Sequence, residues 1–88
     1  MKIRYKSGFK KDLKNIRDKN LLQKIKNIIN EIRISDDLSE ISNMKKLKGY
    51  DSFYRTRAGD FQIGIEIIEN ELIFVRILNR KDMYRFFP

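Results

Sequence analysis

Residues 53–78 read FYRTRAGDFQIGIEIIENELIFVRIL, and this stretch decides the fold. It contains three runs rich in β-branched and aromatic residues, divided by short polar separators at 58–60 and 69–71. Both separators contain Gly, Asp or Asn, which tolerate the backbone geometry of tight turns. The stretch therefore predicts three consecutive antiparallel strands.

Alternation along these strands predicts a sheet with one apolar face and one cationic face, because successive side chains point to opposite sides. The predicted core-facing set is Phe61, Ile63, Ile65 and Ile67 in the second run, with Ile73, Val75 and Ile77 in the third. The predicted opposite set is Phe53, Arg55, Arg57, Gln62, Gly64, Glu66 and Arg76. This register sets Arg55 and Arg57 beside Gln62. Arg80 and Tyr84 follow the last strand and could close over the same surface.

The length and composition indicate one domain over residues 1–88. The chain is 41% hydrophobic and 36% charged, which is enough apolar content for a core. The absence of cysteine excludes disulfides and thiolate metal sites. The N-terminus lacks the apolar run of a signal peptide, and no apolar run approaches the roughly 20 residues that cross a bilayer. We therefore expect a soluble, cytoplasmic protein that does not bind a membrane.

Upstream of the sheet, the pattern predicts a strand over 2–6 and then two amphipathic helices. Ser7 is a candidate cap for the first helix. The apolar positions of that helix are Phe9, Leu13 and Ile16; those of the second, after a break near 18–20, are Leu21, Leu22, Ile25, Ile28, Ile29 and Ile32. The prediction is an α+β fold, in which a helical hairpin packs on one face of a small, mainly antiparallel sheet and a short helical turn ends the chain.

The segments beside these elements give weaker signals. Ile41 and Met44 could anchor a turn of helix, and a basic run follows at 45–49. Asp36, Asp37 and Glu40 could bind a divalent metal, but the segment resembles a solvated loop and has no matching ligand cluster elsewhere. We therefore expect neither a metal nor a cofactor. The closing pair Phe86 and Phe87 should pack against the rest of the domain. If these side chains are exposed instead, they indicate a partner interface.

The chain offers arginine, lysine and tyrosine for chemistry. Histidine is absent, which excludes Ser-His and Cys-His schemes and the paired histidines of many ribonucleases. The net charge of +8 favours a polyanion such as nucleic acid. A cationic pocket of Arg55, Arg57, Arg80 and Tyr84 could bind RNA and assist attack of its 2′-hydroxyl. In the alternative interpretation, these arginines merely pair with Glu66, Asp60 or Asp82 on a solvated face.

Three short motifs occur in order along the chain: KLKG at 46–49, FYRTR at 53–57 with GDF at 59–61, and NRKDMY at 79–84. Their order and spacing resemble the RelE/ParE superfamily of type II toxins, in particular the RelE branch of messenger-RNA interferases. The last motif is similar to the family's His-Arg-x-x-x-Tyr ending, with Asn79 in place of the frequent histidine. The resemblance spans essentially the whole chain.

The resemblance implies a RelE-like fold and a cytoplasmic toxin that cleaves messenger RNA in the ribosomal A site without a metal. A cognate antitoxin would neutralise it, and operator DNA would be bound only by the toxin–antitoxin complex. Arg55 and Arg57 match residues that orient and activate the substrate, and Arg80 matches the arginine that stabilises the transition state. Tyr84 matches the family's proton acceptor and stacking partner.

Further positions are implied to bind substrate. Lys46 and Lys48 match basic positions that contact ribosomal or messenger RNA. Gln62 stands where the RelE branch usually carries another arginine, so it would add a hydrogen bond but no charge. Lys81 or Arg76 could compensate for that missing charge.

Two other functions stay open. The first is a ParE-like inhibitor of DNA gyrase, which shares the fold but acts by binding. The second is a catalytically weak homologue that binds RNA or an antitoxin. This function stays open because Gln62 stands where the RelE branch usually carries an arginine. The retention of Arg80 and Tyr84 beside a cationic sheet favours the nuclease.

Overall fold

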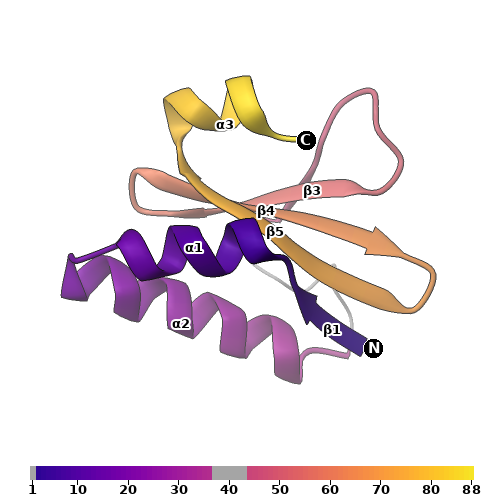
Figure 1. Ribbon diagram of the computed structural model, residues 1–88. Helices are drawn as coiled ribbons and strands as arrows, with labels where there is room; N and C mark the ends of the chain where they lie inside the picture. Colours follow the sequence, from indigo (N-terminus) through magenta and orange to yellow (C-terminus); the bar gives the residue numbers. More distant parts are fainter. Residues whose placement is uncertain (1, 37–43) are drawn as a thin grey trace.

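The computed structural model describes residues 2–36 and 44–88, which form a five-stranded sheet with helices on both faces (Figure 1). The elements are β1 (Lys2–Tyr5), α1 (Ser7–Asn15), α2 (Lys19–Ile34), β2 (Lys45–Lys46), β3 (Phe53–Ala58), β4 (Phe61–Ile68), β5 (Glu71–Asn79) and α3 (Arg80–Phe86). The strand order is β1-β5-β4-β3-β2. The predicted α+β fold is confirmed.

The strands β3, β4 and β5 form the predicted antiparallel meander. Gly59 and Glu69 lie in its two turns with φ of 62° and 55°, the left-handed conformation that such tight connections require. β1 lies parallel to β5 at one edge of the sheet. The basic run that begins at Lys45 is not simply a linker, because its first two residues pair antiparallel with β3 as the opposite edge strand.

The helices α1 and α2 cover one face of the sheet and bury the main core (Figure 1). The buried members of this helix-side core are Phe9, Ile25, Ile32, Ala58, Ile63, Ile65, Leu72, Phe74 and Ile77. Asp18 caps α2, since its Oδ1 accepts hydrogen bonds from the backbone N–H groups of Asn20 and Leu21. The predicted cap at Ser7 is wrong: Lys6 occupies the N-cap position of α1, and its side chain makes no capping hydrogen bond.

A β-bulge in β5 corrects the predicted core face of that strand. Gly64 pairs with Arg76 and Ile65 pairs with Phe74, so Val75 has no partner in β4. The extra residue reverses the alternation of side chains. Leu72 and Phe74 therefore face the helices before the bulge, and Ile77 faces them after it. The prediction that Ile73, Val75 and Ile77 share one face is wrong.

The opposite face of the sheet is only partly cationic. A second cluster on it contains the buried residues Leu78, Met83 and Phe87, with Leu47, Phe53 and Val75 packed against them. α3 covers this apolar half of the face (Figure 1). Phe87 packs down as predicted, whereas Phe86 remains 54% exposed.

Some predictions concern residues outside the described part of the chain. Asp37 and Glu40 of the acidic segment lie there, as does Ile41, whereas Met44 packs against the helix-side core. Among residues 2–36 and 44–88, no three His, Cys, Asp or Glu side chains gather closely enough to hold a metal ion. None of the helices in these two segments has the length and apolar character needed to cross a bilayer.

Candidate functional site

A cationic cavity of about 320 Å³ opens between β2, β3, β4 and the start of α3. It is lined by Lys45, Arg55, Thr56, Arg57, Gly59, Asp60, Gln62, Arg80 and Tyr84. The structure thus brings together all four predicted catalytic residues and Gln62. These residues come from separate elements, and the cavity exists only where the elements meet.

The sheet register places the first arginines of the cavity. Arg55 and Arg57 alternate with Thr56, so both point to the face opposite the helix-side core. Arg57 pairs directly with Gln62 on β4, and paired side chains share a face. The Nε of Arg57 donates a hydrogen bond of 2.9 Å to the carbonyl oxygen of Gly59, which holds the guanidinium at the turn. Among the described residues, the buried Oε1 of Gln62 has no hydrogen-bond partner.

The start of α3 places Arg80 and Tyr84. Asn79 is the N-cap of α3, because its side-chain oxygen accepts a hydrogen bond of 2.9 Å from the backbone N–H of Asp82. The N–H of Arg80 donates to the carbonyl oxygen of Asp60 at 3.2 Å and ties the helix to the β3–β4 turn. Residues four apart share a helix face, so Arg80 and Tyr84 project together into the cavity.

Tyr84 lies among cations and is 63% exposed. The guanidinium carbon of Arg55 lies 5.6 Å from the centre of its ring. Hydrogen bonding from Arg80, and then from Arg55, lowers the pKa of the Tyr84 phenol below its usual range, because both guanidinium groups stabilise the phenolate. The site therefore favours an oxygen base where a substrate could reach it.

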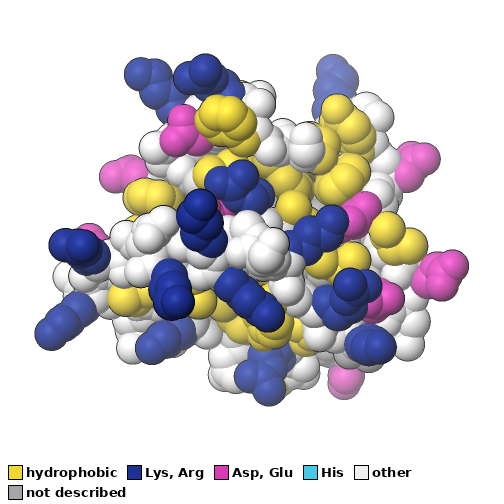
Figure 2. All heavy atoms as spheres, in the orientation of Figure 1, with side chains coloured by type: hydrophobic (Ala, Val, Ile, Leu, Met, Phe, Trp, Pro, Cys, Tyr) yellow, Lys and Arg dark blue, Asp and Glu magenta, His cyan; other side chains and the backbone are white. Residues whose placement is uncertain are grey.

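Among the described residues, the arginines of the cavity do not form the surface ion pairs of the alternative interpretation. Within the described residues, the ion pairs are Arg4 with Glu71 and Arg76 with Asp12. The three arginines thus hold their charge available for an anionic ligand. Positive charge also extends beyond the cavity: Figure 2 shows lysine and arginine side chains spread across α1 and α2, with acidic side chains mostly toward the edges of that view.

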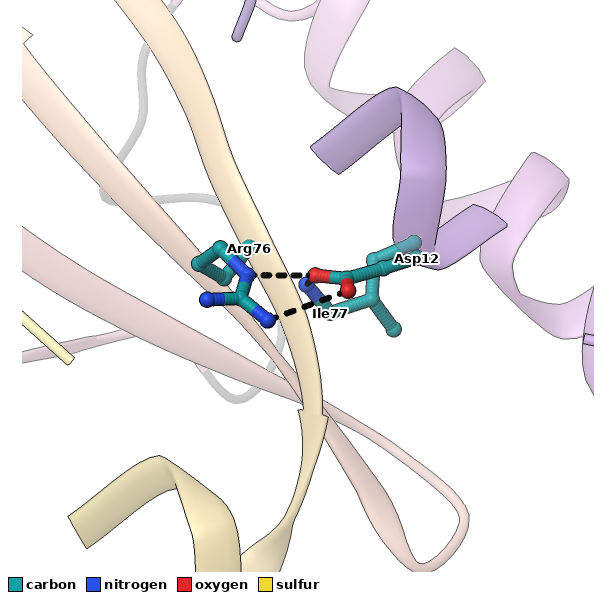
Figure 3. Close-up of polar contacts among 3 residues, drawn as sticks. All are labelled: Asp12, Arg76 and Ile77. Atoms are coloured by element: carbon teal, nitrogen blue, oxygen red, sulfur yellow. Dashed lines mark hydrogen bonds and ion pairs between the residues drawn. The ribbon is translucent and has the colours of Figure 1, made fainter. Parts of the chain in front are cut away.

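Arg76 lies outside the cavity lining, in a structural contact with α1 (Figure 3). Its Nε donates to Asp12 Oδ2 at 2.7 Å, and its Nη2 donates to Asp12 Oδ1 at 3.1 Å. The N–H of Ile77 also donates to Asp12 Oδ2, at 2.9 Å. The Asp12 carboxylate raises the pKa of Arg76, mainly through these hydrogen bonds. Because its charge is already matched, Arg76 is poorly placed to compensate for Gln62.

The predicted substrate-binding lysines also lie outside the cavity lining. Lys48 and Lys81 are exposed, and Lys46 pairs with Tyr54, whose side chain packs toward the helix-side core. The residue that sequence reasoning missed is Lys45, which lines the cavity. Lys45 pairs with Arg55, and this pairing could be found only after the basic run was recognised as a strand.

Comparison with known proteins identifies the family. The family model described as the ParE toxin of type II toxin-antitoxin system, parDE, matches residues 3–84. Toxin RelE3 of Methanocaldococcus jannaschii is 40% identical over 89 residues, covering 100% of both chains. Putative toxin RelE1 of the same organism is 32% identical over 73 residues, covering 82% of this chain and 80% of that toxin.

Solved structures show the same fold. The RelB-RelE antitoxin-toxin complex from Methanococcus jannaschii matches with a TM-score of 0.80 and 40% identity, over 96% of this chain and 98% of that one. The YoeB dimer from Staphylococcus aureus matches with a TM-score of 0.73 over 91% and 97% of the two chains, at 19% identity. The resemblance read from the three motifs is confirmed. This chain belongs to the RelE/ParE superfamily of toxins of type II toxin–antitoxin systems.

Proposed function

We propose that this toxin is a ribosome-dependent endoribonuclease that cleaves messenger RNA in the A site through attack of a 2′-hydroxyl, without a metal. The observation that carries the proposal is the placement of Tyr84 beside Arg55 and Arg80 in the cationic cavity. Cleavage of a phosphodiester by the neighbouring 2′-hydroxyl needs both a base that removes the hydroxyl proton and positive charge around the phosphate. The cavity offers both from side chains alone.

In the proposed reaction, the Tyr84 phenolate takes the proton of the 2′-hydroxyl. The 2′-oxygen forms a bond to the adjacent phosphorus, and the bond from phosphorus to the 5′-oxygen breaks. The leaving 5′-oxygen takes up a proton, so the products carry a 2′,3′-cyclic phosphate and a 5′-hydroxyl. Arg80 and Arg55 stabilise the negative charge that develops on the phosphoryl oxygens, because a guanidinium group can donate two parallel hydrogen bonds to such oxygens. Arg57, held by the Gly59 carbonyl, positions the phosphate.

We further propose a cytoplasmic protein whose partners are the ribosome with its messenger and a cognate antitoxin. Support for the antitoxin comes from a 40% identical relative, which was solved as an antitoxin-toxin complex. An antitoxin acidic in its binding segment would match the cationic cavity. The exposed ring of Phe86, at the C-terminal end of α3, offers an apolar contact for the same segment. Operator DNA would be bound by the toxin–antitoxin complex only.

A gyrase inhibitor is the second candidate function, because the matching family model bears the ParE description. Such an inhibitor acts by binding and needs no base. The position of Tyr84 between two arginines favours the nuclease, since a purely binding surface does not require a tyrosine with a lowered pKa.

The test is messenger cleavage by purified protein on programmed ribosomes, with empty ribosomes and free RNA as controls. Arg80→Ala should lower the cleavage rate by about 10²-fold or more, as expected when one transition-state donor is removed. Arg33→Ala is the matched control, because this exposed arginine of α2 lies outside the cavity lining and should leave the rate within a few-fold. If folded wild-type protein does not cleave, the nuclease proposal is wrong, and a DNA supercoiling assay becomes the next measurement.

A further inference from the structure

Lys45 lines the cavity from the edge strand β2. It is the antiparallel partner of Arg55, so both side chains point to the same face of the sheet. Lys46 pairs with Tyr54 and therefore points to the other face. Among the described residues that line the cavity, Lys45 carries the one ammonium group. The remaining cations of the lining are guanidinium groups.

Lys45 and Tyr84 both lie beside Arg55, and they come from different elements. In the sheet, β3 lies between β4 and β2, so the edge strand that carries Lys45 is on one side of Arg55. α3, which carries Tyr84, makes its main strand contacts with β5 and β4, which follow β3 on the other side in the strand order. A phosphate bound by the Arg55 guanidinium would therefore have the tyrosine on one flank and the lysine on the other.

This arrangement suits an in-line displacement. The attacking oxygen and the leaving oxygen lie on opposite sides of the phosphorus, so the base and the acid of such a reaction belong on opposite flanks. The acid must be able to release a proton. Arginine is effectively never deprotonated in proteins, whereas a lysine ammonium can give up a proton. The chemistry therefore singles out Lys45 among the cations of the cavity.

We propose that Lys45 is the general acid that protonates the leaving 5′-oxygen, an assignment that rests on the proposed nuclease function. As Tyr84 takes the proton of the 2′-hydroxyl, the 2′-oxygen bonds to phosphorus. The bond from phosphorus to the 5′-oxygen breaks, and Lys45 transfers its proton to that oxygen. The neutral amine of Lys45 and the phenol of Tyr84 then exchange protons with water, which restores both groups.

Three variants separate proton donation from simple attraction of charge. Lys45→Ala removes the ammonium, Lys45→Arg keeps the charge but not the acid, and Lys26→Ala removes an exposed lysine of α2 that lies outside the cavity lining. On programmed ribosomes, Lys45→Ala and Lys45→Arg should both lower the single-turnover cleavage rate by about 10²-fold or more. Lys26→Ala should leave that rate within a few-fold. Thermal unfolding midpoints check that all three variants fold.

A second substrate tests the leaving group directly. A messenger in which sulfur replaces the scissile 5′-oxygen releases a thiolate, which needs no proton because thiols are far stronger acids than alcohols. On ribosomes programmed with this messenger, Lys45→Ala and Lys45→Arg should cleave at nearly the wild-type rate. Arg80→Ala should remain slow on both messengers, because it acts on the phosphoryl oxygens.

Each result supports the assignment or overturns it. Rescue of both Lys45 variants by sulfur, with no rescue of Arg80→Ala, supports a general acid. A Lys45→Arg variant that cleaves the oxygen messenger normally shows that only charge is required, and equal loss on both messengers shows that Lys45 only positions the substrate. In those cases the assignment fails while wild-type cleavage still upholds the nuclease. If wild-type protein cleaves neither messenger, the nuclease function fails, and the general-acid role fails with it.

Discussion

The ring of Phe87 lies against the backbone of Gly64, so closely that a Cβ atom on residue 64 would be 2.6 Å from the ring carbon Cε1. The same ring meets Phe53 edge to face at 5.5 Å between centroids. Phe87 directly follows α3, which carries Arg80 and Tyr84. Because Gly64 has no side chain, Phe87 can pack against its backbone, and this contact anchors the C-terminal end of α3 to the sheet.

We predict that Gly64→Ala disrupts the packing of Phe87 against β4. The Cβ atom would meet an aromatic ring packed on both sides, so the ring or α3 must move. The overpacking should lower the free energy of unfolding by about 1–3 kcal/mol. It should also lower the cleavage rate, because Arg80 and Tyr84 move with the helix. Urea unfolding and ribosome cleavage measure the two effects.

A double variant checks that the contact with Phe87 is the cause. Phe87→Ala removes the ring, so Gly64→Ala should cost much less in stability in that background than in the wild type. An equal cost in both backgrounds would show that the strain arises elsewhere in β4.

The second prediction concerns the pH dependence of cleavage. If Tyr84 acts as a base, its phenolate is the active form, so the rate rises with pH until the phenol is deprotonated. The neighbouring Arg80 and Arg55 lower the pKa of Tyr84. The cleavage rate should therefore reach its plateau at a lower pH than it would with a tyrosine of ordinary pKa. Arg80→Gln removes the larger cause and should shift the rise to higher pH, in addition to slowing the reaction.

Tyr84→Phe separates catalysis from stacking. The ring remains but the base is lost, so the rate should fall by about 10²–10⁴-fold and this limb of the pH profile should disappear. Tyr50→Phe is the matched control, since Tyr50 is also exposed but lies outside the cavity lining. A Tyr84→Phe variant that keeps both the rate and the pH profile would assign Tyr84 to stacking alone.

The sequence predicted the parts of the site that depend on local periodicity. Alternation in β3 placed Arg55 and Arg57 on one face, and the position of Arg80 and Tyr84 after the last strand indicated that both could close over that face. The N-cap role of Asn79 was not predicted, although Asn is a residue type that favours this position.

Features that depend on long-range pairing could not be predicted in this way. Residues 72–75 are all apolar, so they give no alternation by which a bulge could be recognised. Lys45 belongs to a strand of two residues, which is too short to show a period and is defined only by its partner β3. Arg76 was read as a free cation because its partner Asp12 lies 64 positions away in the chain.

The third prediction concerns the ion pair of Asp12 and Arg76 (Figure 3). The Asp12 carboxylate also accepts the backbone N–H of Ile77, and its side chain is 15% exposed. Asp12→Ala leaves all three donors without this acceptor, so it should lower the free energy of unfolding by about 1–3 kcal/mol. Asp12→Asn should cost less, because an amide oxygen can still accept one of these bonds.

The surface pair of Arg4 and Glu71 provides the control. The Arg4 side chain is 58% exposed, so Arg4→Ala should change the unfolding free energy by less than about 1 kcal/mol. Urea unfolding of the three variants measures the difference. If Asp12→Ala costs no more than Arg4→Ala, the contact between α1 and β5 does not stabilise the fold as described.

The last prediction is that Gln62→Arg increases the affinity for messenger-loaded ribosomes. The substitution adds a cation to the cavity, and the buried Oε1 that it removes accepts no hydrogen bond among the described residues. The half-saturating ribosome concentration should fall several-fold, and the affinity should depend more steeply on salt because one more phosphate is contacted. Gln23→Arg on the exposed surface of α2 adds the same charge elsewhere and serves as the control. An equal effect of both substitutions would attribute the gain to net charge, whereas a loss of affinity in Gln62→Arg alone would mean that the cavity cannot accommodate a third guanidinium from the sheet.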